Sequence, residues 1–346
     1  MNKKVLIIKD YAMGDEKIKK FDFLKKYGAE IDVVEDRPGI DEDGFSKMFL
    51  QMEQGGPDSL PINEDMVRKA KDADIVISHI SAVSSRVLET AEHLEAVCIL
   101  RSGVENVNLE KAFAHGVKIV NAPGRLAVPV SEYTVGMIIS EMKNISRSFA
   151  DIRNGGFTRV FLNSDYSVNI AGKTIGIIGC GAIGQKVAKV LSVMGADIIV
   201  YDGYMPDEAI RNLGYTPVGL NELFEKADVI ALHYRLTDES EGMIGKEQFD
   251  RMKPTAFFVN TARAGLVDEQ ALIDALTERR IGGAALDVYQ TEPLPEDHPF
   301  RKLDNVTVTS HLAGTCSDVF DITFDIMKQA LTKYFETGEW VNVVNR

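Results

Sequence analysis

The stretch TIGIIGCGAIG (Thr174–Gly184) and the apolar run that later ends at Asp202 decide the fold of this chain. The stretch predicts a strand that runs into three glycines, Gly179, Gly181 and Gly184, and a helical pattern follows. Such glycines allow a tight turn, close approach of phosphate and close helix–strand contact. The second run ends on a carboxylate about 20 residues later. Together these features predict a dinucleotide site at a helix N-terminus, and a turn that serves packing alone is the alternative.

Composition is typical of a globular protein with about two domains. The 346 residues are 45% apolar and 26% charged. The net charge of −13 argues against nucleic acid or an anionic membrane as a partner. The first apolar run stops at Lys9, which predicts a strand and no signal or membrane segment. Cys98, Cys180 and Cys316 lack metal or disulfide spacing and suit a reducing, cytoplasmic location.

Short β-rich runs alternate with helical patterns along the chain, which is typical of α/β architecture with parallel sheets. The first set of expected strands spans 5–9, 31–35, 74–80, 96–101 and 117–121. The second set of six spans 174–179, 197–202, 228–233, 256–261, 283–288 and 305–310. We therefore expect two doubly wound parallel-sheet domains, with the cofactor domain in the middle of the chain.

Two long helices are expected outside the strand sets. One begins near Val130–Ser131, continues to about residue 155, and is a candidate interdomain or dimer helix. The other covers 317–338, after the last strand. Residues 36–63 combine Gly, Pro and acids around a short Met/Phe helix, and this pattern predicts a surface loop excursion.

Polar side chains follow the ends of several strands in the second set, where doubly wound sheets bind their ligands. They are Asp202, His233, Arg263 (just past Thr261), Asp287 and His311. An imidazole at such a strand end can exchange a proton with a substrate, so His311 is the candidate acid/base. An ordinary loop histidine is the alternative. His233 is expected to line the cofactor, and a structural histidine is the alternative there.

Two further side chains suit acid chemistry. The Arg263 guanidinium can hold a carboxylate through two parallel hydrogen bonds, and the alternative is a surface salt bridge to Asp268 or Glu269. Glu292 stands beside a proline, so its loop is stiff, and its carboxylate can bond the His311 imidazole and fix its tautomer. A solvated loop acid is the alternative for Glu292.

With these residues in place, the chain resembles the D-isomer-specific 2-hydroxyacid dehydrogenase family, in a short form without a regulatory extension. The resemblance covers nearly the whole length. The matching stretches are RSGVENVNLEKA (101–112), GVKIVNAPG (116–124), SEYTVGMII (131–139), GIIGCGAIG (176–184), NTARAGLVDEQAL (260–272), AALDVYQTEP (284–293) and SHLAG (310–314).

The resemblance implies a role for each matching residue. Arg263, Glu292 and His311 are the implied catalytic set. The implied cofactor contacts are Gly179, Gly181, Ala182, Ile183, Gly184, Asp202, His233, Tyr234, Thr261, Ala262, Arg263, Asp287, His311, Ala313 and Gly314. The implied substrate contacts are Arg263 and the backbone N–H groups of Ser102, Gly103 and Val104, and His79 is a candidate for the substrate side chain. No metal is expected, because the arginine and histidine supply the charge and the proton.

The family fold implies a Rossmann cofactor domain inserted into a flavodoxin-like substrate domain, with a cleft between them. Residues 1–118 and 315–346 would form the substrate domain and 119–314 the NAD-binding domain. The implied reaction is reversible hydride transfer between nicotinamide and C2 of a D-2-hydroxy acid or 2-keto acid. No arginine directly follows Asp202, which favours NAD over NADP. A homodimer is expected through the helix near Val130.

Departures from the family pattern bear on the substrate. The loop RSGVENVN is short, Arg235 replaces the usual proline, and Leu126 stands where asparagine is common. Family members that act on 3-phosphoglycerate carry a basic phosphate ligand near the end of the third strand. Here Ser78 and His79 stand in that region, so a small or sugar-derived hydroxy acid is favoured over 3-phosphoglycerate. A dinucleotide-sensing binding protein and a formate or phosphite dehydrogenase are the rival functions.

Overall fold

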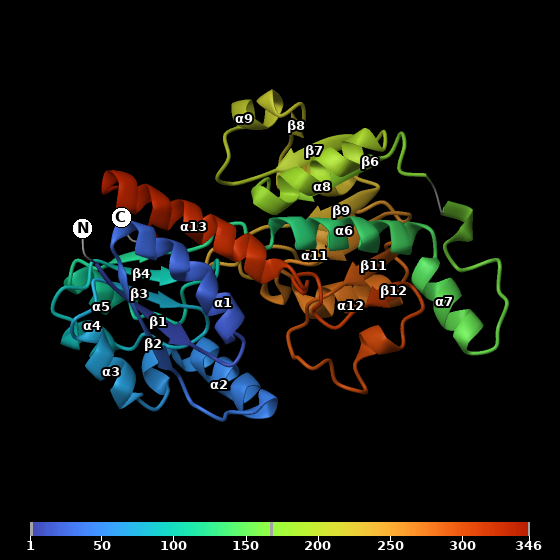
Figure 1. Cartoon of the computed structure of the whole chain (residues 1–346). Helices are drawn as coiled ribbons and strands as arrows, with labels where there is room; N and C mark the ends of the chain where they lie inside the picture. Colours follow the sequence, from blue (N-terminus) through green and yellow to red (C-terminus); the bar gives the residue numbers. More distant parts are fainter. Residues whose placement is uncertain (1–2, 167–168, 345–346) are drawn as a thin grey trace. The chain divides into compact units, whose positions relative to one another are not determined.

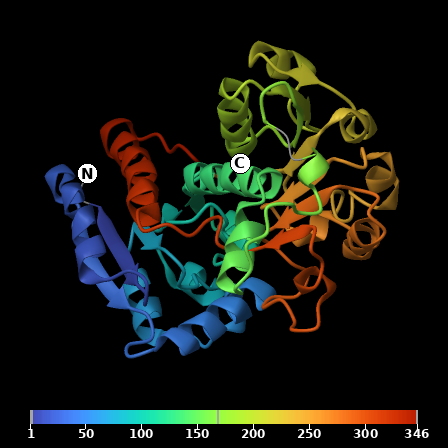
Figure 2. The same ribbon diagram turned by 90° about the vertical axis from the view of Figure 1, so that its right-hand side faces the viewer.

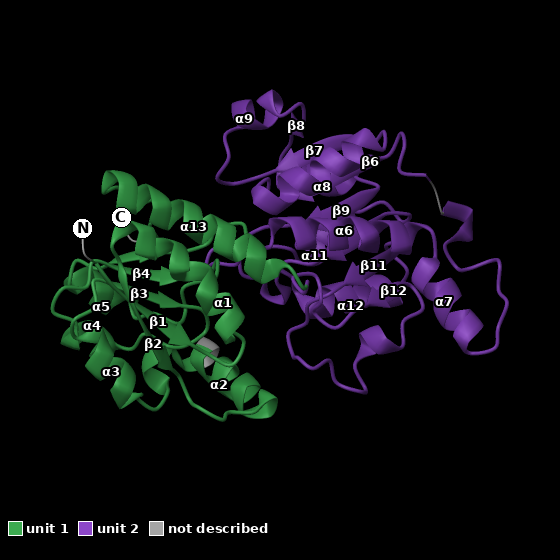
Figure 3. Cartoon of the chain, in the orientation of Figure 1, with its two compact units in different colours: residues 1–125, 317–346 green, residues 126–316 purple. Residues whose placement is uncertain are grey.

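The computed structural model describes residues 3–166 and 169–344, and the chain divides into two compact units (Figures 1 and 3). Unit 1 comprises Met1–Arg125 and Ser317–Arg346, and unit 2 comprises Leu126–Cys316. Each unit contains one parallel sheet covered by helices on both faces. The predicted fold class, two parallel-sheet α/β domains, is confirmed.

Unit 1 contains a five-stranded parallel sheet in the order β2-β1-β3-β4-β5, which is the flavodoxin-like order. The strands are β1 (Lys4–Lys9), β2 (Glu30–Glu35), β3 (Ile75–Ser78), β4 (Ala96–Ile99) and β5 (Lys118–Val120). The helices are α1 (Asp15–Lys19), α2 (Glu42–Gly55), α3 (Glu64–Ala70), α4 (Ser85–Thr90), α5 (Leu109–Ala114) and α13 (Val319–Thr337), with the 3₁₀ segments η1 (Lys20–Tyr27) and η2 (Pro57–Ser59).

Alternation along β1 fixes which helices cover each face of this sheet. Val5 and Ile7 pack against η1 and α13, whereas Leu6 and Ile8 pack against α3, α4 and α5. The last helix therefore belongs to unit 1 although it follows unit 2 in sequence (Figure 3). Its Phe324 and Met327 are buried in that core.

The region 36–63 contains the predicted Met/Phe helix as α2, but this helix is longer than expected and occupies fourteen of its residues. The Asp41 side chain caps this helix by accepting a hydrogen bond from the Gly44 N–H. Met48 and Met52 are buried in a small cluster that includes Ile80, just after β3. The apolar residues of this segment thus form a helix because they pack against Ile80 and its neighbours after β3.

Unit 2 contains a seven-stranded parallel sheet in the order β12-β11-β10-β9-β6-β7-β8, which is Rossmann order with one strand added beside β11. The strands are β6 (Thr174–Ile178), β7 (Asp197–Tyr201), β8 (Thr216–Pro217), β9 (Val229–Leu232), β10 (Phe257–Asn260), β11 (Gly283–Leu286) and β12 (Val306–Val308). The prediction of six strands omitted β8, which has two residues. Its Pro217 is tolerated because β8 is an edge strand.

The helices of unit 2 lie on both faces of its sheet. They are α6 (Ala127–Met142), α7 (Ile145–Arg153), α8 (Ala182–Val193), α9 (Asp207–Asn212), α10 (Leu220–Lys226), α11 (Lys246–Arg251) and α12 (Glu269–Thr277), with η3 (Ser164–Tyr166), η4 (Ala264–Leu266) and η5 (Pro299–Arg301). Helices α6 and α8 pack side by side on one face, and α10, α11 and α12 cover the other (Figures 1 and 2). Among the described helices, none is both long and apolar enough to cross a membrane.

The single long helix predicted from Val130 is two helices, α6 and α7. The break falls at Asn144, whose left-handed φ of 57° suits asparagine better than most residues. Arg147 stabilises the break by binding the buried Glu141 carboxylate at 2.5 Å and the Asn144 side chain at 3.2 Å. Helix α6 also starts earlier than predicted, at Ala127. Pro129 is its third residue, and proline is tolerated in the first helical turn because the N–H groups there have no partner within the helix.

Candidate active site

The glycine turn lies between β6 and the N-terminus of α8. Gly179 has a φ of +92°, and a Cβ there would lie 2.6 Å from the His233 carbonyl oxygen. A Cβ on Gly184 would collide with the carbonyl oxygen of Gly179, so only glycine permits this close helix–strand contact. At Gly181 an added Cβ would meet open space. A phosphate can therefore approach the backbone N–H groups of Ala182 and its neighbours at the start of α8.

The Asp202 side chain forms hydrogen bonds with both the glycine turn and the loop after β7. Its Oδ2 accepts the Cys180 N–H at 2.6 Å, and its Oδ1 accepts the N–H groups of Tyr204 and Met205 at 2.8 and 3.0 Å. An adjoining hollow of about 490 Å³ is lined by Gly179, Gly181, Asp202, Tyr204, Met205, Pro206, His233, Tyr234 and Arg235. A carboxylate accepts about four hydrogen bonds, so Asp202 retains acceptor capacity for a ligand.

His233 lines the same hollow at the end of β9. Both ring nitrogens are inaccessible to water and have no hydrogen-bond partner in the described structure. Burial lowers the pKa of His233 from 6.5 to about 4, so the imidazole is neutral at physiological pH. Two orphaned ring nitrogens beside the glycine turn are groups that a bound ligand can satisfy.

The pKa of His233 predicts a pH-dependent stability. Between pH 6.5 and 4 the unfolded chain binds a proton that the folded chain does not, so the stabilisation present above pH 6.5 is lost as the pH falls towards 4. We expect the free energy of unfolding to lose up to about 3 kcal/mol from this group. Urea unfolding at pH 7 and pH 5 measures it, and a His233→Gln variant with an unchanged pH slope would contradict the prediction.

His311 and Glu292 form a pair at the end of β12. The His311 Nδ1 lies 2.8 Å from the Glu292 Oε2, and the other Glu292 oxygen accepts the Tyr289 N–H at 3.1 Å. Both side chains are partly exposed, at 50% and 37%. The contact occupies Nδ1 and leaves the His311 Nε2 for another partner. Glu292 is therefore paired, in contrast to the alternative of a solvated loop acid.

Asp287 supports the backbone around His311, which has a strained φ of 56°. Asp287 is fully buried. Its Oδ1 accepts the Thr309 hydroxyl at 2.6 Å and the Leu312 N–H at 3.0 Å, and its Oδ2 accepts the Ala313 N–H at 2.8 Å. The carboxylate thus binds the chain on both sides of the histidine. These contacts hold the imidazole in one place.

Arg263 is exposed after β10, and its backbone is fixed by Asn260. The Asn260 side chain donates to the Arg263 carbonyl oxygen at 3.1 Å and accepts the Ala262 N–H at 2.9 Å. The Arg263 Nη1 donates only to the carbonyl of Ala262, at 2.7 Å. In residues 3–166 and 169–344, neither Asp268 nor Glu269 pairs with it, in contrast to the salt-bridge alternative. The buried Thr261 hydroxyl instead lies 2.7 Å from that of Thr134.

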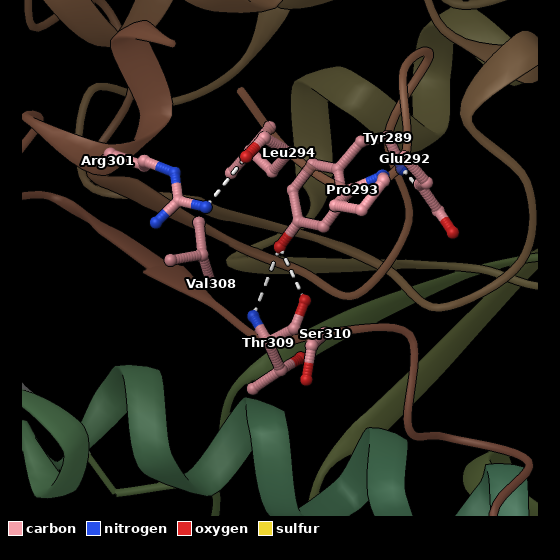
Figure 4. A pocket seen from close by; sticks show the side chains of 8 residues that line it. All are labelled: Tyr289, Glu292, Pro293, Leu294, Arg301, Val308, Thr309 and Ser310. Carbon is pink, nitrogen blue, oxygen red and sulfur yellow. Dashed lines mark hydrogen bonds between the residues drawn. The ribbon is translucent and has the colours of Figure 1, made fainter. Parts of the chain in front are cut away.

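A larger hollow of about 620 Å³ lies beside Glu292 (Figure 4). It is lined by Tyr289, Glu292, Pro293, Leu294, Arg301, Val308, Thr309 and Ser310. The Tyr289 hydroxyl donates to the Thr309 carbonyl at 2.7 Å and accepts its N–H at 3.1 Å. Glu292 is the catalytic candidate that this hollow includes, and the glycine turn lines the smaller one. The smaller hollow is therefore the better candidate for the cofactor.

In unit 1, the predicted substrate residues follow β3 and β4. The Ser102 hydroxyl donates to the Ala122 carbonyl at 3.0 Å, which holds the 102–104 loop beside the end of β5. His79 is largely buried, with its Nδ1 3.4 Å from the Asp10 Oδ2 and its ring edge-on to Phe320. Burial opposes charge on Asp10, but His79 and two backbone N–H groups outweigh it and lower the Asp10 pKa.

Comparison with known proteins places this geometry in context. The sequence profile described as D-isomer specific 2-hydroxyacid dehydrogenase, NAD binding domain, matches residues 135–313, about half of the chain. The chain belongs to this family. NAD is its cofactor, and the glycine turn, the Asp202 carboxylate and the open space at Gly181 fit a dinucleotide. In the part of the chain that the structure describes, no group of three His, Cys, Asp or Glu side chains suits a metal ion.

Individual relatives of this dehydrogenase family member differ in substrate and in length. The D-3-phosphoglycerate dehydrogenase of Methanocaldococcus jannaschii is 38% identical over 82% of this chain, but the match spans only 53% of that protein. The chain thus spans about half the length of the first curated relatives. The glyoxylate reductase of Korarchaeum cryptofilum is 31% identical over 89% of this chain and 94% of its own length.

Solved structures give the same fold for this family member. The D-isomer specific 2-hydroxyacid dehydrogenase of Lactobacillus delbrueckii ssp. bulgaricus, in its NAD complexed form, has a TM-score of 0.77 at 23% identity. The match covers 99% of this chain and 100% of that one. At this identity the likeness shows the fold alone.

Three charged residues that follow strands of unit 1 were not identified from the sequence. Asp10, Arg101 and Arg125 follow β1, β4 and β5 in unit 1. Ligands bind at the carboxyl ends of parallel strands, and Asp10 and Arg101 directly follow such ends in the first strand set. Their positions after β1 and β4 are the sequence signal that identifies them.

Proposed function

We propose that this chain is an NAD-dependent D-2-hydroxyacid dehydrogenase that interconverts a D-2-hydroxy acid and its 2-keto acid. The contact that carries the proposal is the 2.8 Å pair of His311 and Glu292. It lies in the unit that contains the NAD-binding domain, on a backbone held by Asp287. An imidazole oriented by a carboxylate is suited to transfer a proton to or from an alcohol oxygen.

The chain's own residues carry the remaining chemistry, and NADH, when bound, supplies the hydride. Arg263 binds the substrate carboxylate and stabilises the negative charge that develops on the C2 oxygen. The backbone N–H groups of Ser102–Val104 are assigned to the same carboxylate. The Nε2 of His311 donates a proton to the C2 oxygen during reduction and accepts one during oxidation. Glu292 orients the ring and stabilises its cationic form.

Some relatives are named for 3-phosphoglycerate and others for glyoxylate, so these names do not fix the group that the substrate carries beyond C2. We assign the recognition of the substrate side chain to unit 1, where His79 lies against Asp10 and Phe320. A small or sugar-derived hydroxy acid is the proposed substrate.

The decisive test is NADH oxidation with a panel of 2-keto acids, followed by absorbance. The panel contains pyruvate, glyoxylate, hydroxypyruvate, branched and aromatic keto acids, phosphohydroxypyruvate and four-carbon sugar-derived keto acids. We expect one class to be reduced efficiently. Tight NADH binding without reduction of any member would instead support the dinucleotide-sensing alternative.

We also propose a homodimer, formed through α7 and the segment that follows it. Large apolar side chains are exposed here, including Phe149 at 69%, Phe157 at 82% and Val160 at 76%. They lie near a hollow of about 570 Å³ lined partly by α7 and residues 160–162. Large exposed apolar patches are rare in monomers and often mark protein–protein interfaces. Helix α6, the expected dimer helix, buries most of its apolar residues.

Charged substitutions on α7 and in the following segment are expected to break this dimer. The double variant Phe149→Asp/Phe157→Asp should elute as a monomer in light-scattering chromatography, because two buried carboxylates would be strongly unfavourable in an interface. Phe113→Asp is the matched control, since Phe113 is 52% exposed on α5 in unit 1. A double variant that keeps the mass of the wild-type protein would rule out this interface.

A further inference from the structure

Arg125, the last residue of the first segment of unit 1, has a partly buried cationic side chain without an anionic partner among the described residues. Its Nε is inaccessible to water and makes no hydrogen bond, and its Nη1 lies 3.5 Å from the Thr323 hydroxyl of α13. Among the described residues, no carboxylate forms an ion pair with Arg125. A buried charged donor is costly unless an acceptor compensates it. The Nε donor of Arg125 therefore needs an acceptor that the surrounding chain does not provide.

A second guanidinium, that of Arg101, lies near Arg125. Burial, and after it the like charge of Arg101, lower the pKa of Arg125 from 12.5 to about 10, which leaves it cationic at neutral pH. The Arg101 side chain is 12% exposed, stacks over the Phe49 ring at 4.9 Å and lies 3.9 Å from the Glu105 carboxylate. Two neighbouring cations repel one another, and an anion bound beside both would relieve the repulsion.

Arg101 and Arg125 lie at the ends of two segments that hydrogen bonds connect, one of which is the 102–104 loop proposed to bind the substrate carboxylate. The Asn121 side chain donates to the Ser102 carbonyl at 2.5 Å, and the Ser102 hydroxyl donates to Ala122. The 102–104 loop after β4 and the segment after β5 are thereby joined beside the carboxyl ends of these neighbouring strands. Arg101 directly precedes the 102–104 loop, and Arg125 follows the segment after β5 that contains Asn121 and Ala122.

The N-terminal part of α13 lies against Arg125. The N-terminal end of a helix favours an anion nearby and disfavours a cation. Arg125 contacts Thr323 in the second turn of this 19-residue helix. Two acids lie on or before its first turn: Asp318 at the N-cap, and Asp321, which pairs with Lys20 at 2.9 Å. Among the described residues, neither acid forms an ion pair with Arg125 itself.

We propose that Arg125, with Arg101 and Thr323, forms an anion subsite that binds a second acidic group of the substrate. The substrate is then a 2-hydroxy acid with a carboxylate or phosphate at its far end. The inference rests on the dehydrogenase function proposed above. That function already assigns the C2 carboxylate to Arg263 and to the 102–104 loop, which leaves the distal group for Arg125. A local cation is also needed to attract a dianion to a chain with a net charge of −13.

The first experiment compares keto acids that differ only at the far end. The pairs are 2-oxopentanoate with 2-oxoglutarate, and hydroxypyruvate with 3-phosphohydroxypyruvate, so one pair tests a carboxylate and the other a phosphate. We expect the wild-type protein to prefer the dianion in one pair by at least about 10-fold in kcat/KM. Arg125→Gln should reduce kcat/KM for that dianion about 10- to 100-fold, the worth of a charge-assisted pair, and change the neutral member less than about 3-fold.

Matched variants separate recognition from folding. Arg125→Lys keeps the charge and should retain part of the preference for the dianion. Arg68→Gln removes an arginine that is 70% exposed in the same unit, and should change neither substrate. Equal use of dianion and neutral acid by the wild-type protein, unaffected by Arg125→Gln, would overturn the subsite while leaving the dehydrogenase function intact.

A binding measurement tests the subsite without turnover. Inorganic phosphate and succinate should raise the Tm of the wild-type protein and of Arg68→Gln, and have little effect on Arg125→Gln. If no keto acid is reduced but this pattern holds, the subsite stands and the dehydrogenase function fails. If both anions stabilise Arg125→Gln as much as the wild type, the subsite is overturned.

Discussion

His311→Ala is expected to reduce kcat/KM for the best 2-keto acid by about 10²–10⁴-fold, the range for loss of a general acid/base. The imidazole is held for this task from two directions. Glu292 occupies Nδ1 at 2.8 Å, and Asp287 fixes the backbone through Leu312 and Ala313. Alanine removes the proton donor and leaves these supports in place. Steady-state kinetics measure the loss, and NADH affinity by fluorescence should change only a few-fold.

His93→Ala is the matched control for this experiment. His93 is an exposed residue of unit 1, so its removal deletes an imidazole without touching the site. Near-full activity in His311→Ala would exclude this histidine as the acid/base. A loss of activity accompanied by an equal loss of NADH affinity would indicate that His311 serves cofactor binding and not proton transfer.

Much of the fold followed from short-range sequence patterns. The glycine turn and the strand ending at Asp202 have steric requirements that few other structures satisfy. Buried parallel strands such as β9 and β10 are continuous apolar runs, so their positions were also predictable. Strand β8 was not, because two residues including a proline carry no strand pattern. The break at Asn144 depends on the Arg147–Glu141 contact, and apolar periodicity continues across it.

The candidate site was predictable only where its chemistry is local. His311 and Arg263 stand just past strand ends, Glu292 lies in the loop after β11, and their residue types already indicate acid–base and carboxylate chemistry. Other properties depend on tertiary packing. The ring nitrogens of His233 and the Nε of Arg125 lack hydrogen-bond partners because burial removes water without providing one. The residue type at each position can be read from a sequence, but whether a buried polar group has a hydrogen-bond partner depends on the tertiary structure.

Arg263→Gln is expected to lower kcat/KM by about 10²–10³-fold, the usual effect of removing a group that stabilises developing oxyanion charge. The structure leaves this side chain available, because its Nη1 binds only the Ala262 carbonyl and no carboxylate of the described chain pairs with it. Its backbone is anchored by Asn260, so glutamine should leave the loop unchanged. We expect both KM to rise and kcat to fall, since the same guanidinium binds the ground-state carboxylate and the transition state.

The geometry of the guanidinium, and not its charge alone, should account for the loss. Arg263→Lys keeps the positive charge but loses the planar pair of donors, so it should recover only part of the activity. Arg211→Gln is the control, because Arg211 is an exposed partner of Asp207 in the same unit. Added guanidinium ion should restore part of the kcat of Arg263→Ala if the void left by the side chain admits it. Full activity in Arg263→Lys would mean that a point charge suffices and that the carboxylate is oriented by other groups.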